Sequence, residues 1–265
     1  MTDLGTYRDI GVSLDGYVAT VEIRRPPHNF FDSDLIAQIG EAFERLDASD
    51  ACRSIVLAAE GRSFCAGADF SKRMAAGTAN DGTRSSAGKH LYKEASRLFR
   101  TKKPIIGAIH GAAVGGGLGL ACVPDFRVTC SEARFSANFN RLGFHPGFGL
   151  TCTLPRLIGM QQASLLMYTG RRITGEEAVS IGLADYCVPL DQVRAKALEL
   201  ATEIAQSGPL AIIATRETLR RGLADAVAAA TEREYEEQDW LRNTADFKEG
   251  IKAMGERRLP DFQGR

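Results

Sequence analysis

The stretch AIHGAAVGGGLGLACVPD (residues 108–125) decides the fold of this 265-residue chain. It follows the apolar run IIGAI (105–109), and it holds three consecutive glycines with Gly119 just inside the next apolar run. Residues 105–123 contain no Asp, Glu, Lys or Arg and could be mistaken for a membrane span. Because each glycine weakens a helix by about 1 kcal/mol, we predict instead a buried strand, a glycine loop and a buried helix beginning near Leu118.

The same order of strand, turn and helix recurs through the first part of the chain. YRDIGVSL (7–14) and YVATVEI (17–23), the latter with alternating apolar residues, flank the pair Asp15-Gly16, which predicts a hairpin. Asp32 or Ser33 can cap the helix that follows, and SIVLAA (54–59) is typical of a buried strand. We therefore predict a layered α/β core over residues 1–195 and a helical region over residues 196–265.

The composition excludes several classes of partner. Lys plus Arg and Asp plus Glu are balanced at 33 each, so no summed charge favours nucleic acid or a membrane surface. The six cysteines form no CxxC pair or Cys/His cluster, which favours buried thiols in a reducing cytoplasm over disulfides or metal ligands. The N-terminal residues lack the apolar segment of a secretory signal, so we expect a cytoplasmic protein without a metal site.

Two glycine-containing turns carry the candidate chemistry. GRSFCAGADF (61–70) follows the strand at 54–59, and HGAAVGGGLGL (110–120) follows the strand at 105–109. Each turn presents unpaired backbone N–H groups, which favour negative charge. Side by side, the two turns could aim two amides at one oxygen and form an oxyanion hole, although tight structural turns are the alternative reading. The chain has no dinucleotide, P-loop or nucleophile-elbow motif.

The order of several motifs resembles the enoyl-CoA hydratase/isomerase (crotonase) superfamily. FCAGAD (64–69) and AIHGAAVGGGLGLACVPDFRV (108–128) resemble the two parts of its oxyanion-hole signature. Further similar segments are RPPHNFF (25–31), LGFHPGFGLTCTLPRLIG (142–159), GRRITGEEAVSIGLADYCVP (170–189) and FKEGIKAMGERRLPDF (247–262). The resemblance spans nearly the whole chain. It implies the ClpP/crotonase fold, a spiral of ββα units with a C-terminal helical region used for oligomerisation, and a homotrimer or dimer of trimers.

The resemblance also implies the ligand and the residues that bind it. The backbone N–H groups of Ala68 and Gly116 would hold the carbonyl oxygen of an acyl-CoA thioester, and coenzyme A would enter only as part of the substrate, without a separate cofactor. The other substrate-binding candidates are Arg25, His28, Ala66, Gly67, Asp69, Phe70, Gly115 and Phe139. Asp69 also fits a helix cap, and His28 a loop-stabilising role. Rival partners for the phosphates are Arg24, Lys72, Arg73, Lys248 and Lys252.

The sequence departs from the hydratases of this superfamily at the positions of their acid and base. Gly119 and Phe139 stand where hydratases carry two glutamates, and Gly147 stands where several isomerases and hydrolases carry an aspartate. None of these residues can transfer a proton, so the standard hydration mechanism is unsupported. His145 is the candidate proton carrier because histidine titrates near neutral pH, with a structural hydrogen bond as the other reading. For Tyr92 we expect packing rather than chemistry.

Two hypotheses about function follow. The first is an enzyme that stabilises the enolate of an acyl-CoA thioester during isomerisation, decarboxylation or an unusual hydration. The second is a catalytically inactive protein that binds or senses acyl-CoA. The glycine turns fit both hypotheses, and the missing carboxylates favour the second. We predict an enzyme, because an oxyanion hole alone can accelerate a reaction whose substrate supplies its own leaving group.

Overall fold

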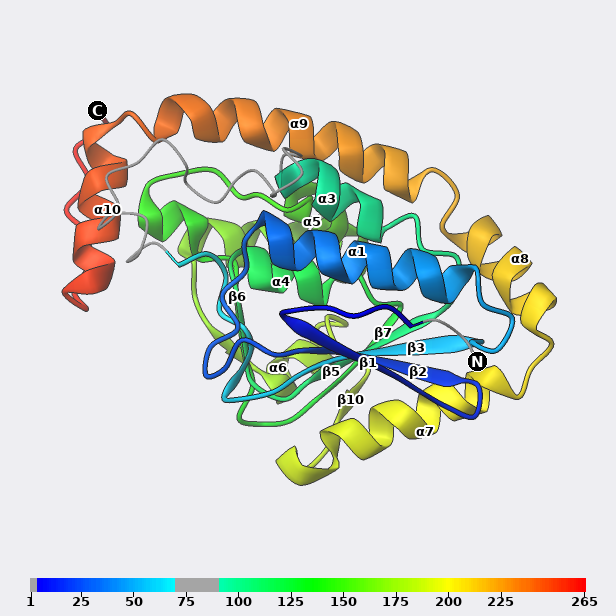
Figure 1. Ribbon diagram of the computed structural model, residues 1–265. Coiled ribbons are helices and arrows are strands. Elements are labelled where there is room, and N and C mark those ends of the chain that lie inside the picture. Colours follow the sequence, from blue (N-terminus) through cyan, green and yellow to red (C-terminus); the bar gives the residue numbers. More distant parts are fainter. Residues whose placement is uncertain (1–3, 70–90) are drawn as a thin grey trace.

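A computed structural model of the protein describes residues 4–69 and 91–265, whose strands form two sheets (Figure 1). The larger sheet contains, in spatial order, β1 (Ile10–Asp15), β2 (Val18–Ile23), β3 (Ser54–Ala59), β5 (Ile105–Ile109), β7 (Phe126–Thr129) and β10 (Tyr186–Cys187). The smaller sheet contains β4 (Ser63–Cys65), β6 (Ala112–Val114), β8 (Arg134–Ser136) and β9 (Ile173–Thr174). Only β1–β2 and β8–β9 pair antiparallel among these strands. The predicted N-terminal hairpin and layered α/β architecture are confirmed.

Successive strands alternate between the two sheets, which gives the chain its spiral course. In three consecutive units the first strand (β3, β5, β7) joins the larger sheet and the next strand (β4, β6, β8) joins the smaller one. The neighbouring strands β4 and β6 are parallel, with Cys65 paired to Ala113. Because parallel strands end at the same edge of a sheet, the two glycine turns that follow β4 and β6 lie next to each other.

The apolar runs 54–59 and 105–109 form two strands in the core, β3 and β5. Every residue of β3 and β5 is buried, as expected for parallel strands covered on both faces. Helix α1 (Ser33–Asp47) begins at the predicted cap, where the Asp32 carboxylate accepts a hydrogen bond from Leu35 N at 2.9 Å. Helix α4 (Gly116–Ala121) is wholly buried, so the region 105–123 folds as β5, β6 and α4. No described helix combines the length and apolarity needed to cross a membrane.

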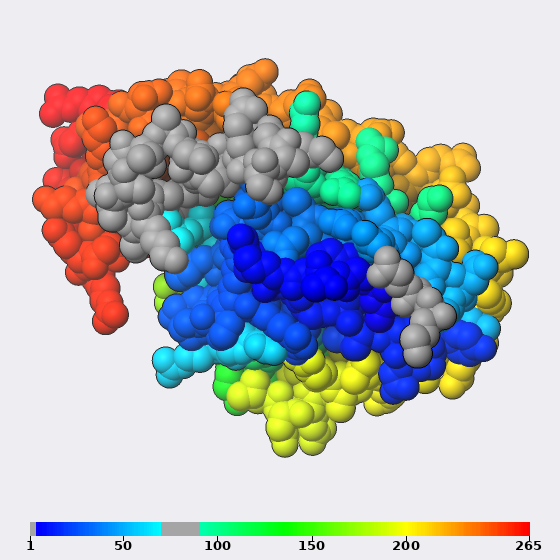
Figure 2. Space-filling model, in the orientation of Figure 1, coloured from blue at the N-terminus to red at the C-terminus, as the bar shows by residue number. Residues whose placement is uncertain are grey.

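Helices dominate the second half of the chain. After η1 (Asn138–Leu142) come α5 (Leu150–Thr169), α6 (Gly175–Ser180), η2 (Leu190–Gln192), α7 (Val193–Ala205), α8 (Pro209–Leu219), α9 (Leu223–Leu241) and α10 (Ala245–Gly255). Helix α7 packs against the larger sheet, α9 packs on α5 and on α3 (Leu91–Leu98), and α10 packs on η1. In Figure 2, α9 and α10 form the orange and red margin of the molecule. A division of the chain at residue 195 stays a prediction.

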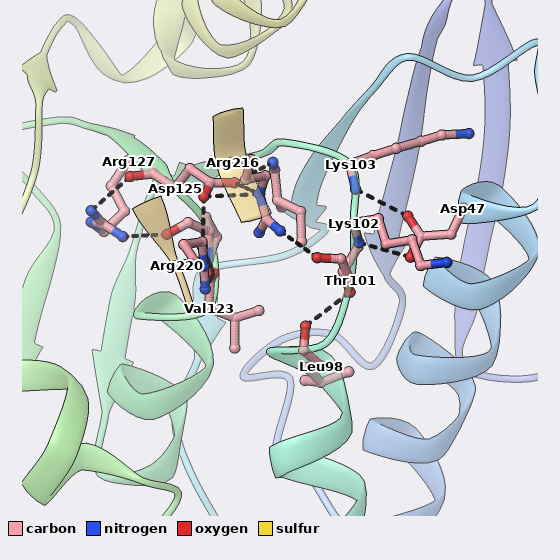
Figure 3. Close-up of polar contacts among 12 residues, drawn as sticks. Asp47, Leu98, Thr101, Lys102, Lys103, Val123, Asp125, Arg127, Arg216 and Arg220 are labelled. Carbon is pink, nitrogen blue, oxygen red and sulfur yellow. Dashed lines mark hydrogen bonds and ion pairs between the residues drawn. The ribbon is translucent and has the colours of Figure 1, made fainter. Parts of the chain in front are cut away.

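Helix α8 is fixed to the core by a buried carboxylate shared between two arginines (Figure 3). Asp125 accepts hydrogen bonds from Ile105 N at 2.8 Å, from Arg216 Nε at 2.9 Å and from Arg220 Nη1 at 2.6 Å. Burial alone would raise the pKa of Asp125, but the charges of the two arginines outweigh it and hold the pKa below its ordinary value. This ion cluster anchors the segment that leads into α9.

Candidate functional site

A cavity of about 440 Å³ opens where the two glycine turns meet. Its lining includes predicted residues from both turns, namely Ala66, Gly67, Ala68, Asp69, Gly115 and Gly116. The remaining surface comes mainly from α3, η1, α9 and the loop before α5. Two motifs that lie far apart in the sequence therefore face one space.

The backbone amides of Ala68 and Gly116 are both available in this cavity. Phe31 pairs with Ala68 in a parallel bridge and donates its N–H to Gly67 O at 2.9 Å, so the Ala68 N–H points away from Phe31. Gly116 is the first residue of α4, where the N–H has no acceptor within its own helix. Within residues 4–69 and 91–265, neither N–H donates a hydrogen bond.

Gly115 and Gly117 must each be glycine, and the structural reason differs between them. Gly115 adopts φ 57° and ψ −124°, a conformation that favours glycine, and its N–H donates to Ser136 O at 2.8 Å. A Cβ on Gly117 would lie 2.0 Å from the carbonyl oxygen of Cys65. Without glycine at these two positions, α4 could not start beside the end of β4.

Aromatic rings occupy the cavity wall at the two positions where glutamates were expected from the resemblance. A Cβ on Gly119 would lie 2.6 Å from Phe148 Cβ, and the Phe148 side chain is 1% exposed. The Phe148 ring packs against Phe31 with centroids 5.5 Å apart. Phe139 lines the cavity and packs against Phe144 at 5.4 Å. The surroundings of the two free amides are therefore largely apolar.

Comparison with known proteins assigns the chain to a family. The family model described as Enoyl-CoA hydratase/isomerase matches residues 14–265. The chain belongs to the enoyl-CoA hydratase/isomerase family. It is similar to a probable enoyl-CoA hydratase of Bacillus subtilis, with 32% identity over 257 residues, covering 96% of this chain and 98% of the relative. It is also similar to the 2,3-dehydroadipyl-CoA hydratase of Escherichia coli, with 33% identity over 258 residues and the same two coverages, 96% and 98%.

A solved structure supports the same assignment at the level of the fold. The crystal structure of an enoyl-CoA hydratase/isomerase from Pseudoalteromonas atlantica superimposes with a TM-score of 0.86 at 28% identity. The match covers 97% of this chain and 100% of that structure. The predicted crotonase fold is thus confirmed.

Gly147, which stood out in the sequence through the resemblance to the superfamily, makes room for side chains from two other helices. A Cβ there would lie 2.5 Å from Tyr92 Oη and 2.6 Å from Gln238 Nε2. The Tyr92 hydroxyl donates to Gln238 Oε1 at 2.5 Å, and Arg242 Nη2 donates to the same oxygen at 3.1 Å. Tyr92 is buried as expected, but it also lines the cavity and is hydrogen bonded.

The sequence reading missed Gln238 and Arg242. Both line the cavity from α9, far along the chain from the glycine turns. The buried residues of α9 are Val227, Thr231, Glu234 and Gln238, a helical stripe in which three of four members are polar. A helix face that packs on the core is normally apolar, so this polar stripe is the feature of the sequence that could have marked α9 as part of the site.

His145 does not line the cavity. Its Nδ1 lies 2.8 Å from Pro146 O, and its backbone carbonyl accepts a hydrogen bond from Gln238 Nε2 at 2.8 Å. Since its ring does not reach the cavity, we propose no proton-transfer role for His145.

Arg25 also lies outside the cavity lining. Its guanidinium pairs with Asp9 at 2.7 Å and with Asp32 at 2.8 Å. Burial opposes the ionisation of Asp9, but hydrogen bonds led by the one from Arg25 hold the pKa of this carboxyl well below its ordinary value. Arg25 thus ties β1 to the start of α1.

The remaining substrate-binding candidates divide between the cavity and the part of the chain that is not described. His28 lies at the cavity mouth with Nδ1 3.4 Å from Ser63 Oγ. Asp69 lines the cavity, whereas the helix it was expected to cap falls within residues 70–90. Phe70, Lys72 and Arg73 lie outside the described residues.

Two other arginines line the cavity in place of the cations singled out in the sequence. Arg24 is paired with Glu22 and Glu60, and neither Lys248 nor Lys252 lines the cavity. Arg134 and Arg172 do, and neither forms an ion pair within the described chain. Because Arg134 pairs with Thr174 across β8 and β9, Arg172 falls on the same face of the smaller sheet as Arg134.

A buried carboxylate behind the cavity wall holds α9 in register with α5. Glu234 is fully buried and accepts hydrogen bonds from Gly149 N at 2.7 Å, Thr151 N at 2.9 Å and Thr151 Oγ1 at 2.6 Å. Burial raises the pKa of Glu234 to about 7, although the three hydrogen bonds by themselves would lower it. Gln238, one turn further along α9, is thereby held beside Gly147.

Proposed function

We propose that this chain binds an acyl-CoA thioester in the cavity and holds its carbonyl oxygen between the N–H groups of Ala68 and Gly116. The observation that supports the proposal is that two residues whose N–H groups donate no hydrogen bond within the described chain line one largely apolar cavity from separate turns. When a thioester becomes an enolate, negative charge gathers on that oxygen. Donors already fixed around the oxygen stabilise the charge without rearranging.

In this proposal coenzyme A follows the smaller sheet outward from the two amides. The pantetheine arm passes Ala66 and His28, and the phosphates meet Arg134 and Arg172. Arg134 is opposite Ala112 on β6. Ala112 begins β6 and Gly116 follows its end, so the phosphates would lie about the length of this strand away from the two amides.

The aromatic wall limits which reaction we propose. Among the described lining residues, Asp69 is the one carboxylate, and Phe139 and Phe148 lie where an acid and a base would be needed. We therefore propose a family reaction that depends on enolate stabilisation, with the proton carried by substrate or water. Binding without turnover is the second candidate, and the ring of Phe148 beside Gly119 favours it.

A matched pair of variants at Gly116 tests the role of the amide. Gly116→Pro removes the N–H at the first position of α4, where proline is tolerated. Gly116→Ala keeps the N–H but adds the same Cβ, which would lie 2.3 Å from the Phe31 ring in both variants. The two variants share the Cβ contact and differ in the N–H, which proline replaces by its ring Cδ, so a difference between them reports on access of a ligand oxygen to this N–H.

The assay incubates each protein with enoyl-, acyl- and malonyl-CoA thioesters, with binding measured by calorimetry and products by chromatography with mass detection. We expect Gly116→Pro to lose about 10²- to 10³-fold in turnover relative to Gly116→Ala. Equal turnover in the two variants would refute the role of this amide. Tight binding with every thioester recovered unchanged would establish the binding protein instead.

A further inference from the structure

A polar cluster interrupts the otherwise apolar acyl end of the cavity. Tyr92 lines the cavity from α3, Gln238 lines it from the last turn of α9, and Arg242 lines it from the residue that caps the end of α9. Tyr92 is 9% exposed and Gln238 is 1% exposed. Apolar residues lining the same cavity include Leu91, Phe139, Leu142, Phe144 and Met254. A polar group in such surroundings needs a complete set of hydrogen bonds.

The hydrogen bonds fix the orientation of the Gln238 carboxamide. Its Nε2 donates to the His145 carbonyl at 2.8 Å, and a carbonyl can only accept. Its Oε1 accepts from the Tyr92 hydroxyl and from Arg242 Nη2, which can only donate. One of the two Nε2 hydrogens is used in this arrangement. The other has no acceptor among the residues that the structure describes.

The Gln238 carboxamide fills the space next to Gly147 and lines the cavity there. A Cβ on Gly147 would lie 2.6 Å from Gln238 Nε2, so any larger residue would cover this donor. Gly147 itself lines the cavity. The next residue, Phe148, lies 3.6 Å from the Cβ position of Gly116. The donor and the proposed oxyanion hole are therefore separated by little more than the Phe148 side chain.

The donors of the cluster favour a ligand acceptor rather than a ligand donor. Arg242 supplies a guanidinium to the cluster. Glu234, the acidic residue one turn before Gln238, is turned to Gly149 and Thr151 and does not line the cavity. A buried amide N–H without an acceptor is unfavourable, so a ligand oxygen placed there would gain a hydrogen bond that the empty site lacks.

We infer that Tyr92, Gln238 and Arg242 form a specificity site for an oxygen on the acyl chain, either a carbonyl or a carboxylate. The protein then prefers acyl-CoA thioesters that carry such an oxygen to those with a plain alkyl chain. Gln238 and Arg242 donate to the oxygen, and Tyr92 orients the Gln238 carboxamide. This inference rests on the proposed function, because it places an acyl thioester in the same cavity.

The test compares acyl groups of equal length by calorimetry on the full chain. Hexanoyl-CoA is the plain ligand, 3-oxohexanoyl-CoA adds a carbonyl, and adipyl-CoA adds a terminal carboxylate. We expect at least one oxygenated thioester to bind about tenfold more tightly than hexanoyl-CoA, and which one identifies the oxygen. Gln238→Met keeps the length of the side chain and should reduce this preference to within about threefold. Gln206→Met, at the exposed end of α7, is the control and should retain it.

The outcomes separate the inference from the proposed function. Binding of all three thioesters with equal affinity would overturn the inference and leave the proposed function standing. A preference that survives in Gln238→Met would also overturn it. Failure of all three to bind would overturn the proposed function and the inference together. If Gln238→Met unfolds, Tyr92→Phe replaces it, because loss of the hydroxyl removes one of the three hydrogen bonds that orient the carboxamide and should weaken the preference while hexanoyl-CoA binding persists.

Discussion

A methyl group added at Gly119 would overlap the side chain of Phe148. The new Cβ would lie 2.6 Å from Phe148 Cβ and 2.8 Å from its Cδ1. Rotation of the phenyl ring cannot relieve the first contact, because Phe148 Cβ is bonded directly to the backbone. That backbone is itself constrained, with φ at 65° in a residue other than glycine.

The contacts allow the free energies of unfolding to be estimated. Gly119→Ala should cost about 1–3 kcal/mol, the usual range for one extra group in a packed core. Phe148→Gly removes a fully buried ring at about 3–5 kcal/mol, less about 1 kcal/mol because glycine accepts the positive φ. The double variant should cost about 1–3 kcal/mol less than the sum, since its second change removes the clash. Phe148→Ala keeps the offending Cβ, so its double variant should recover little.

Denaturant unfolding of these variants gives the coupling directly. Gly255→Ala is the control, because Gly255 ends α10 and a Cβ there meets nothing within 4 Å. A cost for Gly119→Ala no larger than that of Gly255→Ala would refute the packing argument, as would additive effects with Phe148→Gly. The same contact must be relieved in any attempt to restore hydratase activity by Gly119→Glu and Phe139→Glu. Such a variant should therefore also carry Phe148→Gly. A folded triple variant without hydratase activity would contradict the hypothesis that only the two glutamates are missing.

Three further predictions concern pH, the α8 anchor and the cavity mouth. Because the folded pKa of Glu234 is about 7, above its ordinary 4.5, the folded state binds the extra proton, and the free energy of unfolding should fall by up to about 3 kcal/mol as pH rises from 4.5 through 7. Glu234→Gln should remove this part of the pH dependence in denaturation at pH 5 and pH 8. Asp125→Asn should cost about 3–5 kcal/mol, because the buried guanidinium of Arg216 and the half-buried guanidinium of Arg220 lose their carboxylate. Replacing Arg134 and Arg172 by alanine should weaken binding of an acyl-CoA about tenfold at low salt and leave an acyl-pantetheine unaffected.

Each of these predictions has a specific contrary result. An identical pH dependence in the wild type and Glu234→Gln would show that Glu234 does not titrate in this range. Asp225→Asn, which breaks an exposed pair with Arg100, should cost less than about 1 kcal/mol, so an equal cost for Asp125→Asn would contradict the role of burial. Equal weakening of acyl-CoA and acyl-pantetheine would remove Arg134 and Arg172 from the phosphate site.

Local signals in the sequence were sufficient for the elements and for the two turns. The hairpin of β1 and β2, the Asp32 cap of α1 and the buried strands β3 and β5 all follow from patterns within a few residues. The glycines at 115–117 predicted a loop with free amides, and the structure adds that α4 begins slightly earlier, at Gly116. Such features depend on backbone conformations and polarity patterns that neighbouring residues decide among themselves.

The composition of the cavity wall depended on contacts that no local pattern records. Tyr92 and Gln238 are 146 positions apart, yet their hydrogen bond occupies the space that Gly147 leaves open. Arg134 and Arg172 share a face only through the pairing of β8 with β9. The sequence alone marked Gly119 and Gly147 as departures from the family pattern. Only the tertiary structure decided what replaces the missing side chains, because a vacated volume is filled by whichever residues long-range packing brings to it.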